Sequence, residues 1–119
     1  MTAGTYNFTI EQGADLNKTL TFYTDSTRTS TVDLSTHTIA MQIRKEKSSV
    51  DTIDELSSGT ARIDTTNAGS GIIILKWPSS ISSKFNFDKA VYDLELTTAG
   101  GVVSRPLEGT ITLSKEVTK

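Results

Sequence analysis

Apolar and polar residues alternate along most of the chain, the spacing of a β-strand that buries one face. The clearest case is residues 38–44, where Ile39, Met41 and Ile43 point one way and the residues between them point the other. The same period recurs in four further segments, residues 6–10, 16–23, 92–96 and 107–113. We therefore predict a protein built from short strands.

Turn-forming residues separate these segments about every 8–12 residues. They are Gly13 in residues 11–15, the polar connector 25–30, the glycines of 67–71, and the hairpin turn 99–101. Seven to nine strands at this spacing are typical of an Ig-like antiparallel β-sandwich, and a barrel also fits. A parallel sheet is not expected, because the spacers are too short for crossover helices. Pro106 should interrupt the pairing of its own strand.

Three segments are less regular. A three-residue spacing links Val50, Ile53 and Leu56, which fits either a helical turn or a strand, and we predict an edge strand there. A short strand is predicted to follow at residues 61–64. Residues 72–77 are apolar almost throughout, as in a strand covered on both faces or a packed edge. After Pro78, we predict one helical turn near residues 79–84, with Ser79 or Ser80 as its N-cap and with Ile81 and Phe85 buried.

Composition supports one domain spanning residues 1–119. The sequence is rich in threonine, a β-branched residue suited to strands, and it contains no cysteine. No disulfide can form, which favours folding in a reducing cytoplasm. The net charge of −2 gives no reason to expect nucleic acid or an anionic membrane as partner. Residues 1–4 do not begin a basic and then apolar run, so we expect no signal peptide.

Candidate chemistry is sparse. His37 is the only histidine, no Gly-x-Ser-x-Gly elbow accompanies it, and it shares the inward phase of Ile39, so we predict a structural role at a strand start. Asp93 and Glu95 lie two apart on one strand face, where a solvated position is the simpler interpretation. Asp51, Asp54 and Glu55 form a loose acidic group without the spacing of a calcium loop. We expect no enzyme activity, cofactor or metal.

Trp77, Tyr6 and Tyr23 are the candidates for an exposed aromatic surface that stacks on sugars, and we keep Trp77 and Tyr23. Trp77 precedes Pro78 at a strand end, and Tyr23 lies on the outward phase of its strand. Since Ile73 and Leu75 share the phase of Trp77, a core position is favoured for the tryptophan. A carbohydrate-binding module using Trp77 or Tyr23 stays open as an alternative.

Three stretches resemble a group of small β-sandwich proteins of tailed bacteriophages. They are YNFTIEQGADL at residues 6–16, DLSTHTIAMQIR at residues 33–44, and YDLEL at residues 92–96 joined to RPLEGTITLS at residues 105–114. The sequence is similar to phage structural proteins and to the N-terminal β-sandwich domain of upper baseplate proteins and some long tail fibre components. The resemblance implies a virion protein of the tail or baseplate.

The charged residues of these stretches have a physical interpretation of their own. Arg44 and Arg105 lie on outward strand phases, where a bidentate pair with Asp93 or Glu108 would tie neighbouring strands together. A structural ion pair is favoured over a partner-docking role for these four residues. Gln12 and Gly13 supply the turn between the first two strands.

The function expected from this resemblance is a non-enzymatic adaptor that links tail or baseplate components to fibres. Upper baseplate proteins continue beyond such a domain whereas this sequence ends at Lys119, so an adaptor or decorating role is expected rather than receptor binding. The expected partners are other virion proteins in many copies, and the expected location is the virion, assembled in the host cytoplasm. A capsid decoration protein is the alternative within the same class.

The strand register at residues 38–44 can be tested directly. Ile43→Asp places a charge in the predicted core and should abolish soluble expression, because net stability is only about 5–15 kcal/mol. Gln42→Asp, one residue away on the opposite face, should express normally. Equal solubility of the two variants on expression would contradict the register.

Overall fold

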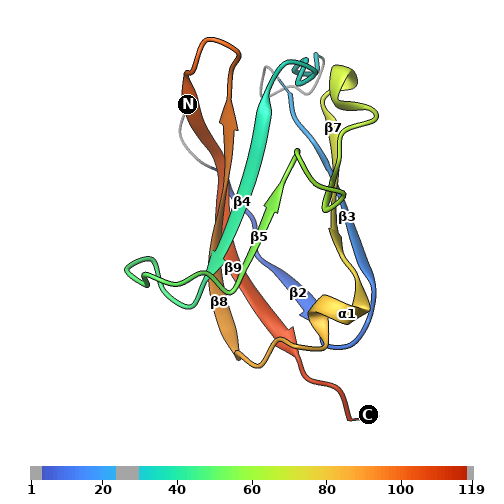
Figure 1. The fold of residues 1–119 in the computed structure, drawn as a ribbon, viewed down its shortest axis with the longest axis vertical. Coiled ribbons are helices and arrows are strands. Elements are labelled where there is room, and N and C mark those ends of the chain that lie inside the picture. The colour runs from blue at the N-terminus through green and yellow to red at the C-terminus, as the bar shows by residue number, and fades with distance from the viewer. Residues whose placement is uncertain (1–3, 24–29, 118–119) are drawn as a thin grey trace.

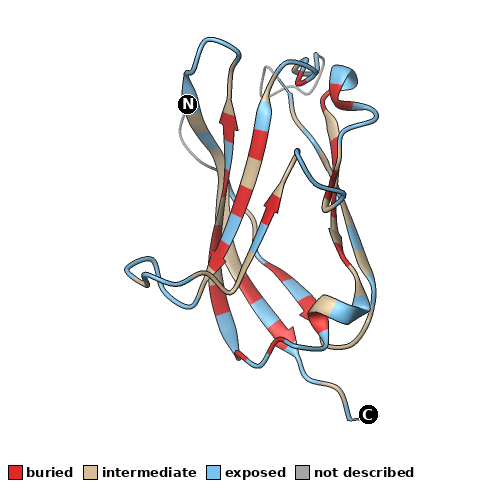
Figure 2. Ribbon diagram, in the orientation of Figure 1, coloured by how far each residue is buried: buried red, intermediate tan, exposed pale blue. Residues whose placement is uncertain are grey.

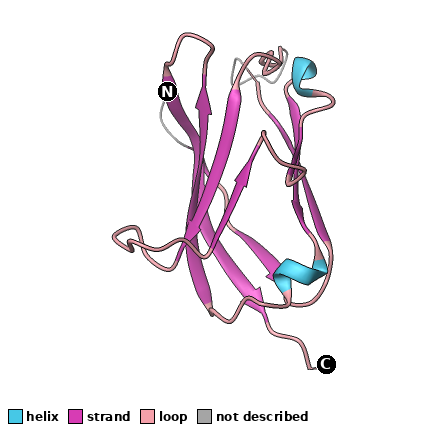
Figure 3. Ribbon diagram, in the orientation of Figure 1, coloured by secondary structure: helices cyan, strands magenta, loops and turns pink. Residues whose placement is uncertain are grey.

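The computed structural model describes residues 4–23 and 30–117 and shows two β-sheets packed face to face (Figure 1). Strands dominate, with one short α-helix and one 3-10 turn (Figure 3). The elements are β1 (Gly4–Thr5), β2 (Phe8–Glu11), β3 (Leu16–Thr21), β4 (Thr38–Arg44), β5 (Asp54–Ser57), β6 (Ile63–Asp64), η1 (Ala68–Ser70), β7 (Ile72–Trp77), α1 (Ser79–Ser82), β8 (Lys89–Thr97) and β9 (Val103–Ser114). The predicted all-β sandwich is confirmed. The connector predicted at residues 25–30 lies, apart from Ser30, outside the described residues.

One sheet has six strands in the order β1-β9-β8-β4-β5, with β2 also paired to β9, and the other has three in the order β3-β7-β6. All pairings are antiparallel except those of β1 and β2 with β9, which are parallel. Parallel pairing was not expected from the sequence, because its spacers are too short for crossover helices. No crossover helix is needed here, because the two ends of the chain meet and the whole intervening fold connects them.

The core lies between the sheets and is built from the inward phases of the strands (Figure 2). Ile39, Met41 and Ile43 are buried, as predicted. The apolar run 72–77 forms the central strand of the smaller sheet, so it is not an edge. Its residues alternate between buried positions and outer positions that are only half-buried.

The segments of uncertain type are strands, and they are short. β5 is an edge strand, as predicted for residues 50–56, but it covers only Asp54–Ser57. The strand predicted at residues 61–64 is reduced to β6.

The predicted helical turn is present as α1, but the predicted N-cap is wrong. Pro78 occupies the N-cap position, and no side chain of the turn caps it. Instead Asp15 accepts a hydrogen bond from the Ser79 amide at 2.6 Å, so a distant carboxylate takes the role of the cap. Phe85 is buried as expected, whereas Ile81 is only half-buried and Ser82 is the buried residue of the turn.

Gln12 and Gly13 do more than turn the chain. Gly13 has a φ of 83°, the left-handed conformation that glycine adopts without strain. The Gln12 amide donates to the Phe85 carbonyl at 2.6 Å and accepts from the Glu116 amide at 3.0 Å. This side chain thereby ties the end of β2 to the segments that follow α1 and β9.

The N-terminal strand crosses β9 in very close contact at Gly109. A Cβ atom on Gly109 would collide with the backbone carbonyl of Tyr6. The Tyr6 amide donates to the Glu108 carbonyl at 2.9 Å, and the Tyr92 hydroxyl donates to the Tyr6 carbonyl at 2.5 Å. Burial raises the pKa of the Tyr92 phenol above its ordinary value, which keeps this donor protonated. The absence of a side chain at Gly109 therefore permits the N-terminal segment to pair with β9.

Pro106 interrupts its ladder as predicted. The register between β8 and β9 shifts between Leu94 and Leu96, opposite the segment that contains Pro106. An irregularity of this kind accommodates a residue that has no amide hydrogen to donate.

Gly109→Ala should destabilise the fold by about 1–3 kcal/mol, the usual cost of overpacking a closely packed site. Gly59→Ala is the matched control, because its Cβ would meet only Ser57 Oγ at 3.9 Å, an ordinary contact. Urea denaturation of both variants measures the difference. An equal effect on the free energy of unfolding would contradict the close approach.

Candidate functional site

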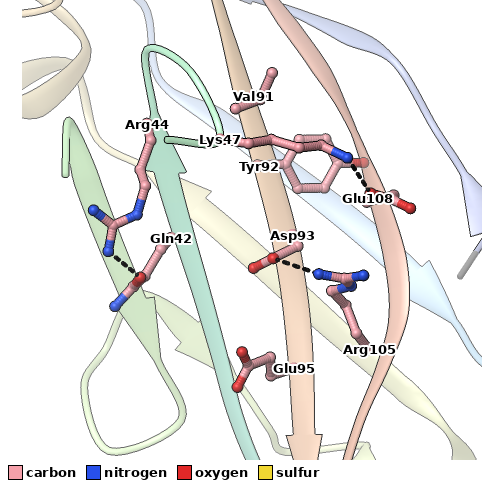
Figure 4. A pocket seen from close by; sticks show the side chains of 9 residues that line it. All are labelled: Gln42, Arg44, Lys47, Val91, Tyr92, Asp93, Glu95, Arg105 and Glu108. Carbon is pink, nitrogen blue, oxygen red and sulfur yellow. Dashed lines mark hydrogen bonds and ion pairs between the residues drawn. The ribbon is translucent and has the colours of Figure 1, made fainter. Parts of the chain in front are cut away.

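The outer face of the six-stranded sheet carries a charged groove (Figure 4). Its floor is formed by β4, β8 and β9, and the loop after β4 supplies Lys47. The polar side chains lining it are Gln42, Arg44, Lys47, Asp93, Glu95, Arg105 and Glu108. Apart from Lys47, all of them come from the second and third stretches of the family resemblance. We call this surface the charged face.

Ion pairs link neighbouring elements on the charged face. Arg105 Nη1 lies 3.5 Å from Asp93 Oδ2, which joins β9 to β8 as predicted, although by one contact rather than two. Lys47 Nζ lies 3.2 Å from Glu108 Oε2, a pair that the strand pattern did not indicate. The Arg105 and Asp93 side chains are 54% and 37% exposed, so water screens their attraction and leaves both groups accessible.

Arg44 does not pair with Asp93 or Glu108, and that expectation is wrong. Its guanidinium donates to the carbonyls of Ser49 and Val50 at 2.9 and 2.7 Å and to Gln42 Oε1 at 2.8 Å. The loop after β4 folds back and offers carbonyl oxygens nearer than either carboxylate. Arg44 thus fixes this loop beside the charged face.

Trp77 cannot serve as a stacking surface, because it is 0% exposed. Its ring packs against Phe8 with centroids 5.6 Å apart, in the core position that its phase favoured. Tyr23 is 37% exposed and pairs with Thr31 in an isolated bridge, so only this one of the two proposed aromatics is available at the surface.

His37 lies just before β4, half-buried, as expected for a strand start. Its Nδ1 is buried and has no hydrogen-bond partner among the described residues. Asp33, four residues earlier, accepts a hydrogen bond from the Ser35 amide at 2.9 Å, and the Ser35 hydrogen bonds hold the pKa of that carboxyl below its ordinary value. No group of three or more histidine, aspartate and glutamate side chains in residues 4–23 and 30–117 is placed to hold a metal ion.

Of the acidic residues at positions 51–55, Asp51 and Glu55 are exposed as expected, whereas Asp54 is half-buried and paired. Asp54 forms a two-contact ion pair with Arg62, at 3.1 and 2.6 Å, and the Arg62 Nε donates to the Lys76 carbonyl at 2.8 Å. These side chains are only 16% and 10% exposed. The pair joins β5 of one sheet to the β6–β7 side of the other, and so it closes one lateral side of the sandwich.

On the opposite lateral side, no described strand or ion pair joins the two sheets, and we call this the open side. There β3 ends the smaller sheet, and β1 and β2 end the larger one. A groove between these edges is lined by Tyr6, residues 19–23, Pro106 and Leu107. Tyr6, Leu20, Phe22 and Leu107 belong to the apolar residues that the core covers only in part. We call this the edge groove.

Lys18 is the unexpected residue of the open side. It lies on the inward phase of β3 between Leu16 and Leu20, and its ammonium is 5.2 Å from the ring centroid of Tyr6 and 5.4 Å from that of Phe8. The sequence signal for this residue is a charge on the buried phase of a predicted strand. Arg62 gave no comparable signal, because its partner is set only by the packing of the two sheets.

Comparison with known proteins does not assign the chain to a family. No protein-family model matches the sequence, and no curated protein matches it. Of the described helices, none has the length and apolar character needed to cross a membrane.

The two kinds of ion pair should differ in their effect on stability. Arg62→Ala leaves a largely buried Asp54 without its partner and should cost about 3–5 kcal/mol. Arg105→Ala removes an exposed pair and should cost about 0–1 kcal/mol. Urea denaturation of both variants provides the measurement, and a larger loss for Arg105→Ala would show that the lateral ion pair is not important for the fold.

Proposed function

We propose that this protein is a non-enzymatic structural component of a tailed-phage particle, an adaptor between tail or baseplate proteins and fibres. It would act through its surfaces, in many copies, within a virion assembled in the host cytoplasm. Weak single contacts suffice in such an arrangement, because repeated binding in a ring multiplies their effect. The partners are other virion proteins, with no role for nucleic acid or a membrane.

The observation that carries this proposal is the charged face. Residues 42 and 44 belong to one resembling stretch and residues 93, 95, 105 and 108 to another, yet β4, β8 and β9 bring their polar side chains to one surface. The predicted structural pair Arg105–Asp93 lies within this surface and is partly exposed. Exposed charges of both signs favour one defined alignment with a protein surface of complementary charge.

A carbohydrate-binding role loses much of its support, since Trp77 is fully buried. A capsid decoration role uses the same kind of contact surface and differs only in position within the particle. Separating purified particles into heads and tails distinguishes it from the tail adaptor.

If the proposal is right, mass spectrometry of particles from a phage that carries this protein should detect it in many copies in the tail fraction. Arg105→Glu reverses one charge on the exposed face and should reduce incorporation by about tenfold or more, because like charges across an interface repel. Its melting temperature should change little.

Lys84→Glu is the matched control, since Lys84 is exposed and lies outside the charged face. It should be incorporated as efficiently as the unmodified chain. Absence of the protein from particles would remove the proposal, and equal incorporation of Arg105→Glu would remove the charged face as its docking surface.

A further inference from the structure

On the open lateral side, the outer edge of β3 is paired with no other strand of residues 4–23 and 30–117. Phe22 N–H donates to the Gly71 carbonyl at 2.8 Å, and the same register pairs Leu20 with Ile73 and Leu16 with Trp77. Hydrogen-bonded and non-hydrogen-bonded positions alternate in an antiparallel pair. The backbone N–H and C=O groups of Asn17, Thr19 and Thr21 therefore point away from β7, toward the open side.

The inward side chains beside this edge are incompletely covered. Leu20 of β3 and Phe22 just after it line the edge groove together with Tyr6 and Leu107, and all four side chains are half-buried. A strand added to β3 would place alternate side chains opposite Leu20 and Phe22, inside this groove. Apolar residues at those positions would complete the burial.

Lys18 favours a negatively charged residue at the position of the added strand that faces it. Its ammonium rests over the rings of Tyr6 and Phe8 at 5.2 and 5.4 Å, and no carboxylate of the described residues forms an ion pair with it. A carboxylate on an added strand, opposite Lys18, would supply that partner in a site partly shielded from water. Opposite charges on directly facing strand positions stabilise the pairing.

A second copy of this chain fits the edge less well. Pairing two β3 strands would bring two Lys18 ammonium groups into the same groove, and an inward-pointing charge on an edge strand is a feature that discourages such self-association. The β1–β2 edge across the groove is interrupted between Thr5 and Phe8, whereas β3 runs unbroken from Leu16 to Thr21.

We propose that β3 binds an extended segment of a partner protein as an added antiparallel strand, with apolar residues opposite Phe22 and Leu20 and an acidic residue opposite Lys18. The inference builds on the proposed adaptor role by naming the chemistry of one partner segment. Backbone hydrogen bonds provide affinity in this mode, and the alternate side chains provide specificity.

The probe for the test is the synthetic peptide acetyl-Thr-Val-Thr-Val-Thr-Glu-Thr-amide, titrated into the purified full chain. Amide NMR shifts should move at residues 17–21. Replacing the peptide glutamate by glutamine should weaken binding by about fivefold, the scale of a partly exposed ion pair. Lys18→Glu should lose its preference for this peptide and gain one for the version with lysine in place of glutamate.

Thr19→Pro tests the edge itself. Proline is tolerated where the amide hydrogen points away from the neighbouring strand, so the fold should persist while peptide binding is lost. Thr9→Pro is the matched control on β2, because the Tyr6 and Gln12 amides donate to β9 and the Thr9 amide therefore faces away from it. This control should bind normally. If Thr19→Pro lowers the melting temperature, the same test is made on the peptide side. A peptide N-methylated on the residue facing Thr19 lacks the amide hydrogen for this contact, so it should not bind the unmodified chain.

Several results would overturn the proposal. They are the absence of shifts at residues 17–21, equal affinity of the acidic and neutral peptides, loss of binding in Thr9→Pro but not in Thr19→Pro, and sedimentation of the free chain as a dimer that Thr19→Pro dissociates. The titration uses the isolated protein, so its outcome is independent of particle composition. Peptide binding by a chain absent from virions would remove the adaptor role alone, and a virion component that ignores the peptide would remove the strand addition alone.

Discussion

The contact between the two ends of the chain is the constraint on which the rest of the structure depends. The Tyr6 backbone passes over Gly109 so closely that no side chain fits between them, and the hydrogen bonds from Tyr92 and to Glu108 hold it there. This contact sets the edge of the larger sheet. It also places the Tyr6 ring where it lines the edge groove and lies beneath the Lys18 ammonium. A change at residue 109 should therefore affect stability and the open side together.

The two lateral sides of the sandwich differ in whether an ion pair joins the two sheets. On one side, Arg62 and Asp54 join the sheets through a largely buried pair. On the other, no equivalent pair is present among the described residues, and the edge strands β3 and β2 remain separate. An open edge is a hazard for aggregation unless something limits it. The inward Lys18 supplies that limit, and the same charge gives the edge a preference for an acidic partner.

Charge has a different role on the outer face. Arg105, Asp93, Lys47 and Glu108 form exposed pairs that contribute little to stability. They present charges of both signs on the outer face of the six-stranded sheet. The proposed adaptor role and the proposed strand addition would use separate surfaces, the outer face of the larger sheet for one and the edge of β3 for the other.

The sequence alone determined the strands and their buried phases, because alternation is a local property that follows from the pleat. It therefore predicted the burial of Ile43, the core position favoured for Trp77, and the helical turn after Pro78. The Arg105–Asp93 pair was also within reach, since both residues lie on outward phases of strands joined by one hairpin.

Only the tertiary structure decided the features that depend on residues far apart in the chain. The parallel pairing of β2 with β9, the reason for Gly109 and the Arg62–Asp54 pair each require a register between distant segments, which local periodicity does not contain. The partner of Arg44 was mispredicted for the same reason, as its loop folds back and offers carbonyls. Which edge stays free is likewise settled when the sheets pack, because an edge is defined by the strand that does not pair with it.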